Sequence, residues 1–426
     1  MTKRSVHCLR EINATPDQVW QIVSSFTDSW HPAMLWCERA INLPDTPDSM
    51  IRRFQMKNDE TIYREQRTYF NETERCFRYL LLEGIPDCRS YSAEVRVAAG
   101  SKGKSVILWW AQIEASATRA FEIASGTKTI LEKGLETLSE KFSGKSKPVS
   151  SNFIIDNGQK LALTTVGDGE LCLFLHGIGG NRANWSRQLL EVSSFCRAVS
   201  MDFRGYGDSK LGENQTTIED YITDILAVMK HFRAEKINLV GLSYGSWIAT
   251  SFAQTYPEKM SSLTVSGGCT GMSEAGEKVR TAFLKARLEP LDSGKTPADF
   301  AQNVVPLLKG PACSLEVENE LLASMSAISA ATYRDALTCF TSPPGPLDFT
   351  KFNFPVLLMT GEHDQLARPE EIKKVAERIA ESQRANSLQP DVQFEVLDNA
   401  GHLANLEQPE AYNAVLTCFS RRAILK

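Results

Sequence analysis

Five short and nearly continuous apolar runs in the second part of the chain most constrain its fold. They occupy residues 171–175, 197–201, 237–240, 262–265 and 355–359. Runs without polar alternation are typical of strands that are buried on both faces of a parallel sheet. Segments with helical periodicity, such as 217–232 and 246–256, alternate with these runs. The order predicts a doubly wound α/β domain.

The interval between the fourth and fifth runs is far longer than an ordinary crossover between neighbouring strands. Its residues carry helical patterns, which predict an inserted helical cap at about 270–350.

A polar seam with Gly144 and Pro148 interrupts the chain before this domain and lacks apolar periodicity. It predicts two domains, 1–144 and 152–426, joined by a linker at 145–151.

The first domain begins with a strand-like segment at 6–12, after which Thr15 and Pro16 mark the start of a helix. Alternating segments predict antiparallel strands at 50–56, 61–69, 76–82, 90–97 and 105–114. A long amphipathic helix at 117–142 closes the domain, with an apolar set that comprises Phe121, Ile123, Ile130, Leu131, Leu135 and Leu138. The order of elements predicts an α+β fold.

Composition excludes several classes of partner and site. The net charge of −5 gives no polybasic surface, so neither nucleic acid nor an anionic membrane is an expected partner. The ten cysteines are scattered without a CxxC pair, and we find no signal peptide or membrane-spanning run, which predicts a cytoplasmic protein. Isolated histidines and the absence of a dinucleotide loop predict no metal and no cofactor. The oligomeric state is not predicted.

The motif Gly241-Leu242-Ser243-Tyr244-Gly245 follows the 237–240 run and opens a helical segment. A tight strand-to-helix turn of this kind is a nucleophile elbow, in which glycines relieve steric clashes and the serine oxygen stands at the helix N-terminus. Ser243 is therefore the predicted nucleophile.

A serine hydroxyl needs a general base to take its proton. Only two of the six histidines, His363 and His402, follow Ser243 as the Ser–acid–His chain order requires. His402 lies between a strand at 392–397 and a final helix and is the predicted base.

The acid that orients this base is expected on the loop after the 355–359 strand. Asp364 is the predicted acid, and Glu362 is the alternative on the same loop.

Backbone N–H groups are expected to form the oxyanion hole. The predicted donors are Tyr244, which follows the nucleophile, and Ile178, which follows the 171–175 strand. His176 is expected to be structural, as are the polar residues of the MDFRGYGDS turn, namely Asp202, Arg204 and Asp208.

The segments INATPDQVWQIVSSF, RCFRYLLLEG and SVILWWAQIEA resemble the START-like superfamily, in particular its polyketide cyclase/dehydrase (SRPBCC-type) branch. This resemblance implies a helix-grip fold, in which a curved sheet holds the long helix over an apolar ligand cavity. We expect the cavity to be lined by Tyr69, Phe77, Tyr79, Leu81, Trp109 and Ile113. The alternative is that these side chains simply pack against the helix.

The GLSYG, MDFRGYGDS and AGHLANLEQPEAYNAVLTCF segments resemble the α/β-hydrolase superfamily, especially its enol-lactonases and esterases. One departure is Ser246, where relatives usually have a second glycine.

The chain is therefore predicted to be a serine hydrolase that cleaves an ester, lactone or thioester of a hydrophobic small molecule through an acyl-enzyme, with an accessory ligand-binding domain. One alternative is a C–C bond hydrolase or a non-hydrolytic cyclase or condensing enzyme of polyketide-like metabolites. Another is a ligand-binding protein whose hydrolase domain is vestigial.

Overall fold

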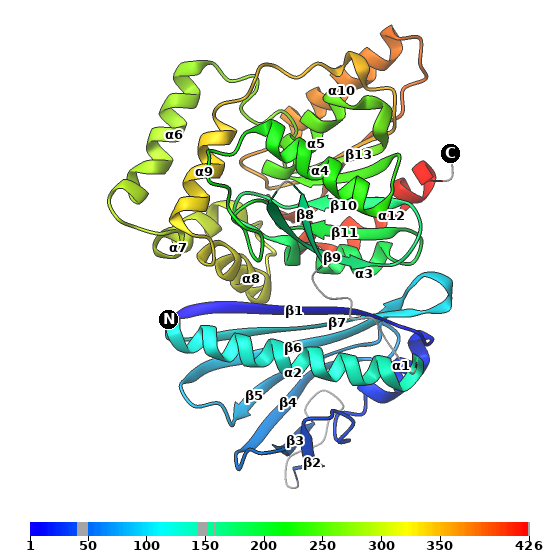
Figure 1. Ribbon diagram of the computed structural model, residues 1–426, viewed down its shortest axis with the longest axis vertical. Coiled ribbons are helices and arrows are strands. Elements are labelled where there is room, and N and C mark those ends of the chain that lie inside the picture. Colours follow the sequence, from blue (N-terminus) through cyan, green and yellow to red (C-terminus); the bar gives the residue numbers. More distant parts are fainter. Residues whose placement is uncertain (41–49, 144–151, 157, 425–426) are drawn as a thin grey trace. The chain divides into compact units, whose positions relative to one another are not determined.

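The computed structural model describes residues 1–40, 50–143, 152–156 and 158–424, so the predicted linker at 145–151 lies outside the described residues. The chain divides into two compact units, Met1–Ser150 and a second unit built from most of the residues that follow. Each unit contains one sheet (Figure 1). No described helix is long and apolar enough to cross a membrane. All ten cysteines are free thiols.

The first unit is a seven-stranded antiparallel sheet with the strand order β1-β7-β6-β5-β4-β3-β2. The long helix α2 (Ala117–Ser143) lies along the sheet, and α1 (Pro16–Val23) packs near β6 and β7 (Figure 1). The strands are β1 Thr2–Ile12, β2 Met34–Arg39, β3 Ile51–Met56, β4 Ile62–Asn71, β5 Cys76–Glu83, β6 Cys88–Ala99 and β7 Ser105–Ala115.

Helix α1 begins where the sequence predicts it. The Thr15 hydroxyl accepts a hydrogen bond from the Gln18 amide, and the Gln18 side chain accepts one from the Thr15 N–H at 3.0 Å. This capping box satisfies two amide groups that would otherwise lack partners, and Pro16 supplies a preset φ at the first helical position.

The inward face of α2 differs in part from the prediction. Ile123, Leu131 and Leu138 are buried, but Phe121 is 64% exposed and Ile130 is 39% exposed. Phe121 precedes Ile123 by two residues, which places it on the far side of a helix with 3.6 residues per turn. The buried stripe is therefore narrower than the apolar composition suggests.

A β-bulge in β4 also changes the predicted cavity lining. The pairing with β5 shifts register between Arg67 and Tyr69, so the strand presents Arg67 and Phe70 to the interior side instead of Tyr69. The phenol of Tyr69 instead contacts Glu74 at 3.2 Å. Strand β2 was not predicted, because it is a short edge strand without apolar alternation.

The second unit is an eight-stranded sheet with the order β15-β14-β13-β12-β10-β11-β9-β8. Strands β10 to β15 run parallel, while β8 and β9 form an antiparallel hairpin at one edge. The bounds are β8 Asn152–Asp156, β9 Gln159–Val166, β10 Leu171–Leu175, β11 Arg197–Met201, β12 Ile237–Leu242, β13 Met260–Ser266, β14 Val356–Gly361 and β15 Val392–Leu397.

Helices cover both faces of this sheet. Helices α4 and α5 pack together, as do α3 and α12, and the two pairs lie on opposite faces (Figure 1). The chain reverses its winding direction at β10, so β10 and β12 flank the switch point where open α/β sheets bind ligands. These helices are α3 Ser186–Val192, α4 Ile218–Phe232, α5 Tyr244–Thr255, α10 Pro369–Ala385, α11 Ala404–Glu407 and α12 Pro409–Ile424.

Four helices lie between β13 and β14, in the interval where the sequence predicts a cap. They are α6 Glu277–Asp292, α7 Pro297–Leu308, α8 Leu315–Ser326 and α9 Ala330–Phe340. We refer to these four helices as the cap.

The imidazole of His31 is buried in the first unit and is held by two backbone contacts. Its Nδ1 accepts from the Ala33 N–H at 3.1 Å, and its Nε2 donates to the Ile130 carbonyl at 3.0 Å, which fixes the neutral ring. Burial lowers the pKa of His31 from 6.5 to about 4.

We expect the free energy of unfolding to fall as the pH is lowered through this window, because the unfolded chain takes up a proton at His31 that the folded state resists. Between pH 6.5 and pH 5 the loss should be about 1.5 kcal/mol from this residue. Urea unfolding monitored by tryptophan fluorescence measures it, and His31→Gln should have a flatter pH dependence. Equal pH dependence in both proteins would contradict this role.

Candidate functional site

Ser243 occupies a strained turn between β12 and α5. Its backbone has φ 53° and ψ −110°, a region that non-glycine residues seldom adopt and that costs about 1–3 kcal/mol. A Cβ atom at Gly241 would clash with the Gly245 carbonyl, and one at Gly245 would clash with the Leu175 carbonyl. Gly241 is therefore required by the tightness of the turn itself, and Gly245 by the close approach of the elbow to β10.

The three residues predicted to act together are joined by hydrogen bonds. The Nε2 atom of His402 lies 2.9 Å from the Oγ of Ser243, and its Nδ1 atom lies 2.9 Å from the Oδ2 of Asp364. Asp364 is 1% exposed and His402 is 6% exposed. In this arrangement the Nε2 of His402 can accept the proton of the Ser243 hydroxyl, while the Asp364 carboxylate contacts the Nδ1 side of the same imidazole.

Asp364 is held in its anionic form. Burial alone would raise its pKa, but hydrogen bonds from His402 and from the amides of Leu366 and Ala367 outweigh burial and lower the pKa below its ordinary value. The alternative acid, Glu362, is exposed and accepts instead from the Asn399 N–H at 3.0 Å. The structure thus brings Asp364, and not Glu362, against His402.

The predicted oxyanion donors lie at the switch point of the sheet. Leu175 of β10 pairs in register with Gly241 of β12, so the loops that follow these parallel strands emerge side by side. Ile178 and Tyr244 both line the same cavity as Ser243.

Ser246 lies where relatives usually have a second glycine, and its hydroxyl is hydrogen-bonded within the structure. It is fully buried, and its Oγ lies 2.8 Å from the Gly241 carbonyl and 2.9 Å from the Ser266 carbonyl. The hydroxyl also accepts from the Ser266 N–H at 3.1 Å. Ser246 therefore joins the start of α5 to the ends of β12 and β13.

His176, expected from the sequence to be structural, has both ring nitrogens engaged by the backbone. Its Nε2 accepts from the Phe203 N–H at 3.1 Å, and its Nδ1 donates to the Gly177 carbonyl at 2.8 Å. Burial lowers its pKa to about 4. The ring supports the loop that carries Ile178 and has no free nitrogen for proton transfer.

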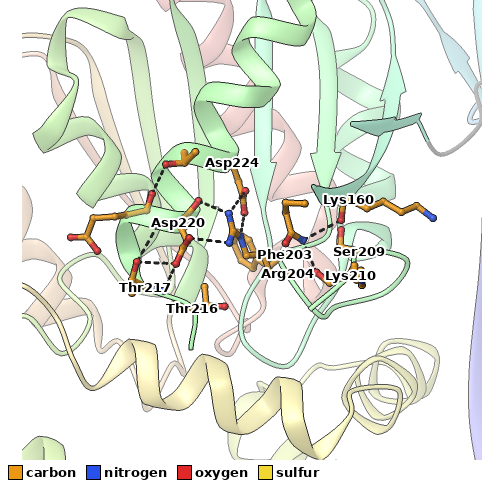
Figure 2. Close-up of polar contacts among 12 residues, drawn as sticks. Lys160, Phe203, Arg204, Ser209, Lys210, Thr216, Thr217, Asp220 and Asp224 are labelled. Atoms are coloured by element: carbon orange, nitrogen blue, oxygen red, sulfur yellow. Dashed lines mark hydrogen bonds and ion pairs between the residues drawn. The ribbon is translucent and has the colours of Figure 1, made fainter. Parts of the chain in front are cut away.

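The turn after β11 is held by ion pairs with neighbouring elements. Arg204 contacts Asp224 at 2.7 Å and Asp220 at 2.9 Å, both on α4 (Figure 2). Asp202 is fully buried, pairs with Arg182 and accepts from the Asp208 N–H at 3.0 Å. The contacts of Asp202, Arg204 and Asp208 therefore hold this turn against neighbouring elements, as expected for structural residues.

An apolar cavity of about 370 Å³ opens above Ser243. The cap contributes much of its wall, together with the start of α10. Its lining includes Phe283, Val304, Val305, Leu308, Leu321, Met325, Tyr333, Leu337 and Phe340 from the cap, and Leu366, Ile372 and Val375 from the other side. The site can accommodate a hydrophobic group next to the nucleophile.

Glu407 is a site residue that the sequence analysis missed. Its buried carboxylate accepts from the N–H groups of Gly401 at 3.1 Å, Leu403 at 3.3 Å and Gly310 at 2.6 Å. Burial raises its pKa, which these N–H groups partly offset. One carboxylate thus fixes the loop on both sides of His402 and joins it to the cap. The available signal was an acidic residue inside the otherwise apolar HLANLEQPEAY segment.

Two family models match the chain. The model of the alpha/beta hydrolase fold matches residues 171–409, more than half of the sequence. The chain belongs to the α/β-hydrolase family. Residues 3–143 match the family described as polyketide cyclase / dehydrase and lipid transport, which agrees with the antiparallel sheet and long helix of the first unit. The α/β-hydrolase unit thus follows a START-like unit.

Similar proteins align with the α/β-hydrolase unit. 3-Oxoadipate enol-lactonase 2 of Acinetobacter baylyi is 23% identical over 60% of this chain and 90% of its own length. 2-(Acetamidomethylene)succinate hydrolase of Mesorhizobium japonicum is 26% identical over 59% of this chain and 88% of its own. The structure of a thermophilic esterase from Thermogutta terrifontis has a TM-score of 0.54 and 24% identity, covering 64% of this chain and 98% of that one. The protein is a hydrolase of this family.

Asp364→Asn should lower kcat by on the order of 10⁴-fold, because an amide favours the wrong imidazole tautomer. Glu362→Gln on the same loop is the matched control and should lower kcat by less than about threefold, because Glu362 is exposed and faces Asn399. Ester hydrolysis measured for both variants tests the assignment. A larger loss in Glu362→Gln than in Asp364→Asn would move the acid to Glu362.

Proposed function

We propose that the α/β-hydrolase unit is a serine hydrolase that cleaves an ester, lactone or thioester of a hydrophobic small molecule through an acyl-enzyme. The observation that carries the proposal is the hydrogen-bonded series Ser243–His402–Asp364 at the floor of an apolar cavity. Esterases and an enol-lactonase among the similar proteins support the same reaction class.

The proposed reaction begins with attack of the Ser243 Oγ on the carbonyl carbon while His402 takes the hydroxyl proton at Nε2. Asp364 holds the Nδ1–H and stabilises the imidazolium that results. The negative oxygen of the tetrahedral intermediate is stabilised by the N–H groups of Ile178 and Tyr244.

Collapse of this intermediate breaks the bond to the leaving group, which receives the proton from His402 and departs. A water molecule then gives its proton to His402 and attacks the acyl carbon. The second tetrahedral intermediate then breaks its bond to the Ser243 Oγ, which takes the proton back from His402 as the acid is released. The proposed steps use only the three side chains, the two backbone N–H groups and a water molecule.

Ser243→Ala should lower kcat by on the order of 10⁶-fold and leave the fold intact, because the nucleophile is lost while the cavity gains only a small void. A fluorophosphonate should label the wild-type protein and not the variant. If the wild type resisted the label, the site would be vestigial. If the variant kept a tenth of the wild-type activity, another residue would be the nucleophile.

We also propose that the START-like unit binds a hydrophobic small molecule. A cavity of about 220 Å³ opens between its sheet and α2, and its lining includes Tyr79, Leu81 and Trp109, which are among the residues expected from the sequence. Phe77 and Ile113 belong instead to the packed core behind it.

The cavity is less apolar than the sequence suggests. Arg52 and Glu65 are both buried in its wall, where Arg52 Nε donates to Glu65 at 2.8 Å and its guanidinium lies 4.2 Å from the Phe26 ring centre. Burial raises the pKa of Glu65, and Arg52 partly offsets this. A ligand with an apolar body and one polar group fits this wall best.

Gly126→Leu should weaken ligand binding to this unit at least severalfold. Gly126 lines the cavity, no atom outside the adjoining stretch of α2 lies within 4 Å of a Cβ atom built there, and a leucine would favour the helix. Titration with a hydrophobic fluorescent dye measures the effect, and Lys128→Leu, on the exposed side of α2, is the control. Equal dye affinity in the wild type, Gly126→Leu and Lys128→Leu would place the dye outside this cavity. Ser243→Ala, which alters the other unit, should bind the dye as the wild type does.

A further inference from the structure

Helix α6 of the cap presents two arginines, Arg280 and Arg287, on a partly buried face that is otherwise apolar, and Arg280 donates to the Ala275 carbonyl at 2.8 Å. Phe283, Leu284, Leu288 and Leu291 are partly or fully buried on this face, as expected for a helix that packs on one side. Arg287 occurs on the same face and is also partly buried. The side chains of Lys278 and Lys285 are exposed, so this helix does not lack solvent-facing positions for a cation.

Arg287 lines the cavity above Ser243. It is the one lysine or arginine in the cavity wall formed by the described residues. The other side chain with a permanent charge in the wall is Glu371, which is exposed at the start of α10. Among the residues that the structure describes, no carboxylate forms an ion pair with Arg287.

Ring contacts place Arg287 at a distance from the reacting serine. Its guanidinium carbon lies 5.1 Å from the centre of the Phe283 ring. The Phe283 ring contacts that of Phe340 at 6.2 Å, and Phe340 contacts Tyr244, the neighbour of Ser243, at 5.7 Å. Arg287 is thus separated from the elbow by two aromatic side chains.

Tyr333 provides a second polar atom in this region. It lines the same cavity and is 5% exposed. Burial raises the pKa of its phenol, and the positive charge of Arg287 acts in the opposite direction. A hydroxyl donor therefore lies within the electrostatic reach of the guanidinium.

We propose that Arg287 binds a carboxylate of the substrate, at the end remote from the bond that Ser243 cleaves. Such a substrate is an ester or lactone of a dicarboxylic acid, with an apolar chain between its two carboxyl groups. The guanidinium offers a planar pair of N–H donors that matches a carboxylate, and the low polarity of the surrounding wall strengthens the contact. This inference rests on the proposed hydrolase function and specifies its substrate.

Two esters of equal length test the proposal. 4-Nitrophenyl hydrogen adipate carries the free carboxylate, and 4-nitrophenyl 6-oxoheptanoate carries a methyl ketone in its place. Wild type should have the higher kcat/KM for the adipate. Arg287→Met should lower the ratio of the two kcat/KM values by roughly ten- to a hundredfold, the value of a hydrogen-bonded charge pair. Arg287→Lys, which keeps the charge but not the planar fork, should lose less of the ratio.

Lys285→Met is the matched control, because it removes a positive charge from the exposed side of the same helix. Its ratio should equal that of the wild type. Equal losses of the ratio in Lys285→Met and Arg287→Met would indicate a general electrostatic effect, and an unchanged ratio in Arg287→Met would also overturn the proposal.

A second measurement separates this proposal from the proposed reaction. Adipate should slow fluorophosphonate labelling of Ser243 in the wild type and much less in Arg287→Met, whose labelling without adipate also reports an intact fold. Labelling that adipate slows equally in both proteins would refute a role for Arg287 and leave the serine hydrolase standing. A wild type that neither cleaves an ester nor accepts the label would refute the proposed function itself.

Discussion

The functional site depends on how closely the backbone packs at the carboxyl ends of the central strands. The elbow that carries Ser243 lies so near to β10 that a single additional carbon atom at Gly245 would overlap the Leu175 carbonyl. The strained φ of Ser243 can persist because buried contacts on each side fix the turn, including those of the Ser246 hydroxyl. The hydroxyl of the nucleophile therefore stands within 2.9 Å of His402 before any ligand arrives.

The sequence was most informative where a local rule and a chain order agreed. Continuous apolar runs predicted the parallel strands because burial on both faces leaves no polar position to alternate. The elbow, the acid and the base could be predicted because a strand-to-helix turn indicates one residue and the order of loops indicates the others. The contact of Asp364 with His402 then distinguishes it from Glu362, which local sequence alone could not do.

The predictions failed where the result depended on three-dimensional register or on pairing between distant residues. A bulge in β4 turned Tyr69 away from the cavity, and helical phase placed Phe121 in solvent. The pairing of Arg52 with Glu65 has no local signature, because the two residues lie on different strands and meet only in the folded sheet. Removing one member of such a buried pair costs about 3–5 kcal/mol, so this polar feature is also a condition for the stability of the START-like unit.

The contacts of Glu407 have a consequence for the engineering of the cap. The loop that carries His402 and the chain between α7 and α8 are in direct backbone contact. Gly310 and Gly401 allow this contact, because a Cβ atom on either would clash with the backbone of the other segment. The His402 N–H also donates to the Leu308 carbonyl at 2.7 Å. The same carboxylate binds an amide from each partner. A cap grafted from another hydrolase would therefore bring a foreign surface to the histidine loop. The α7–α8 connection and the His402 loop are thus coupled in this chain, and exchanging the cap would require redesigning the loop.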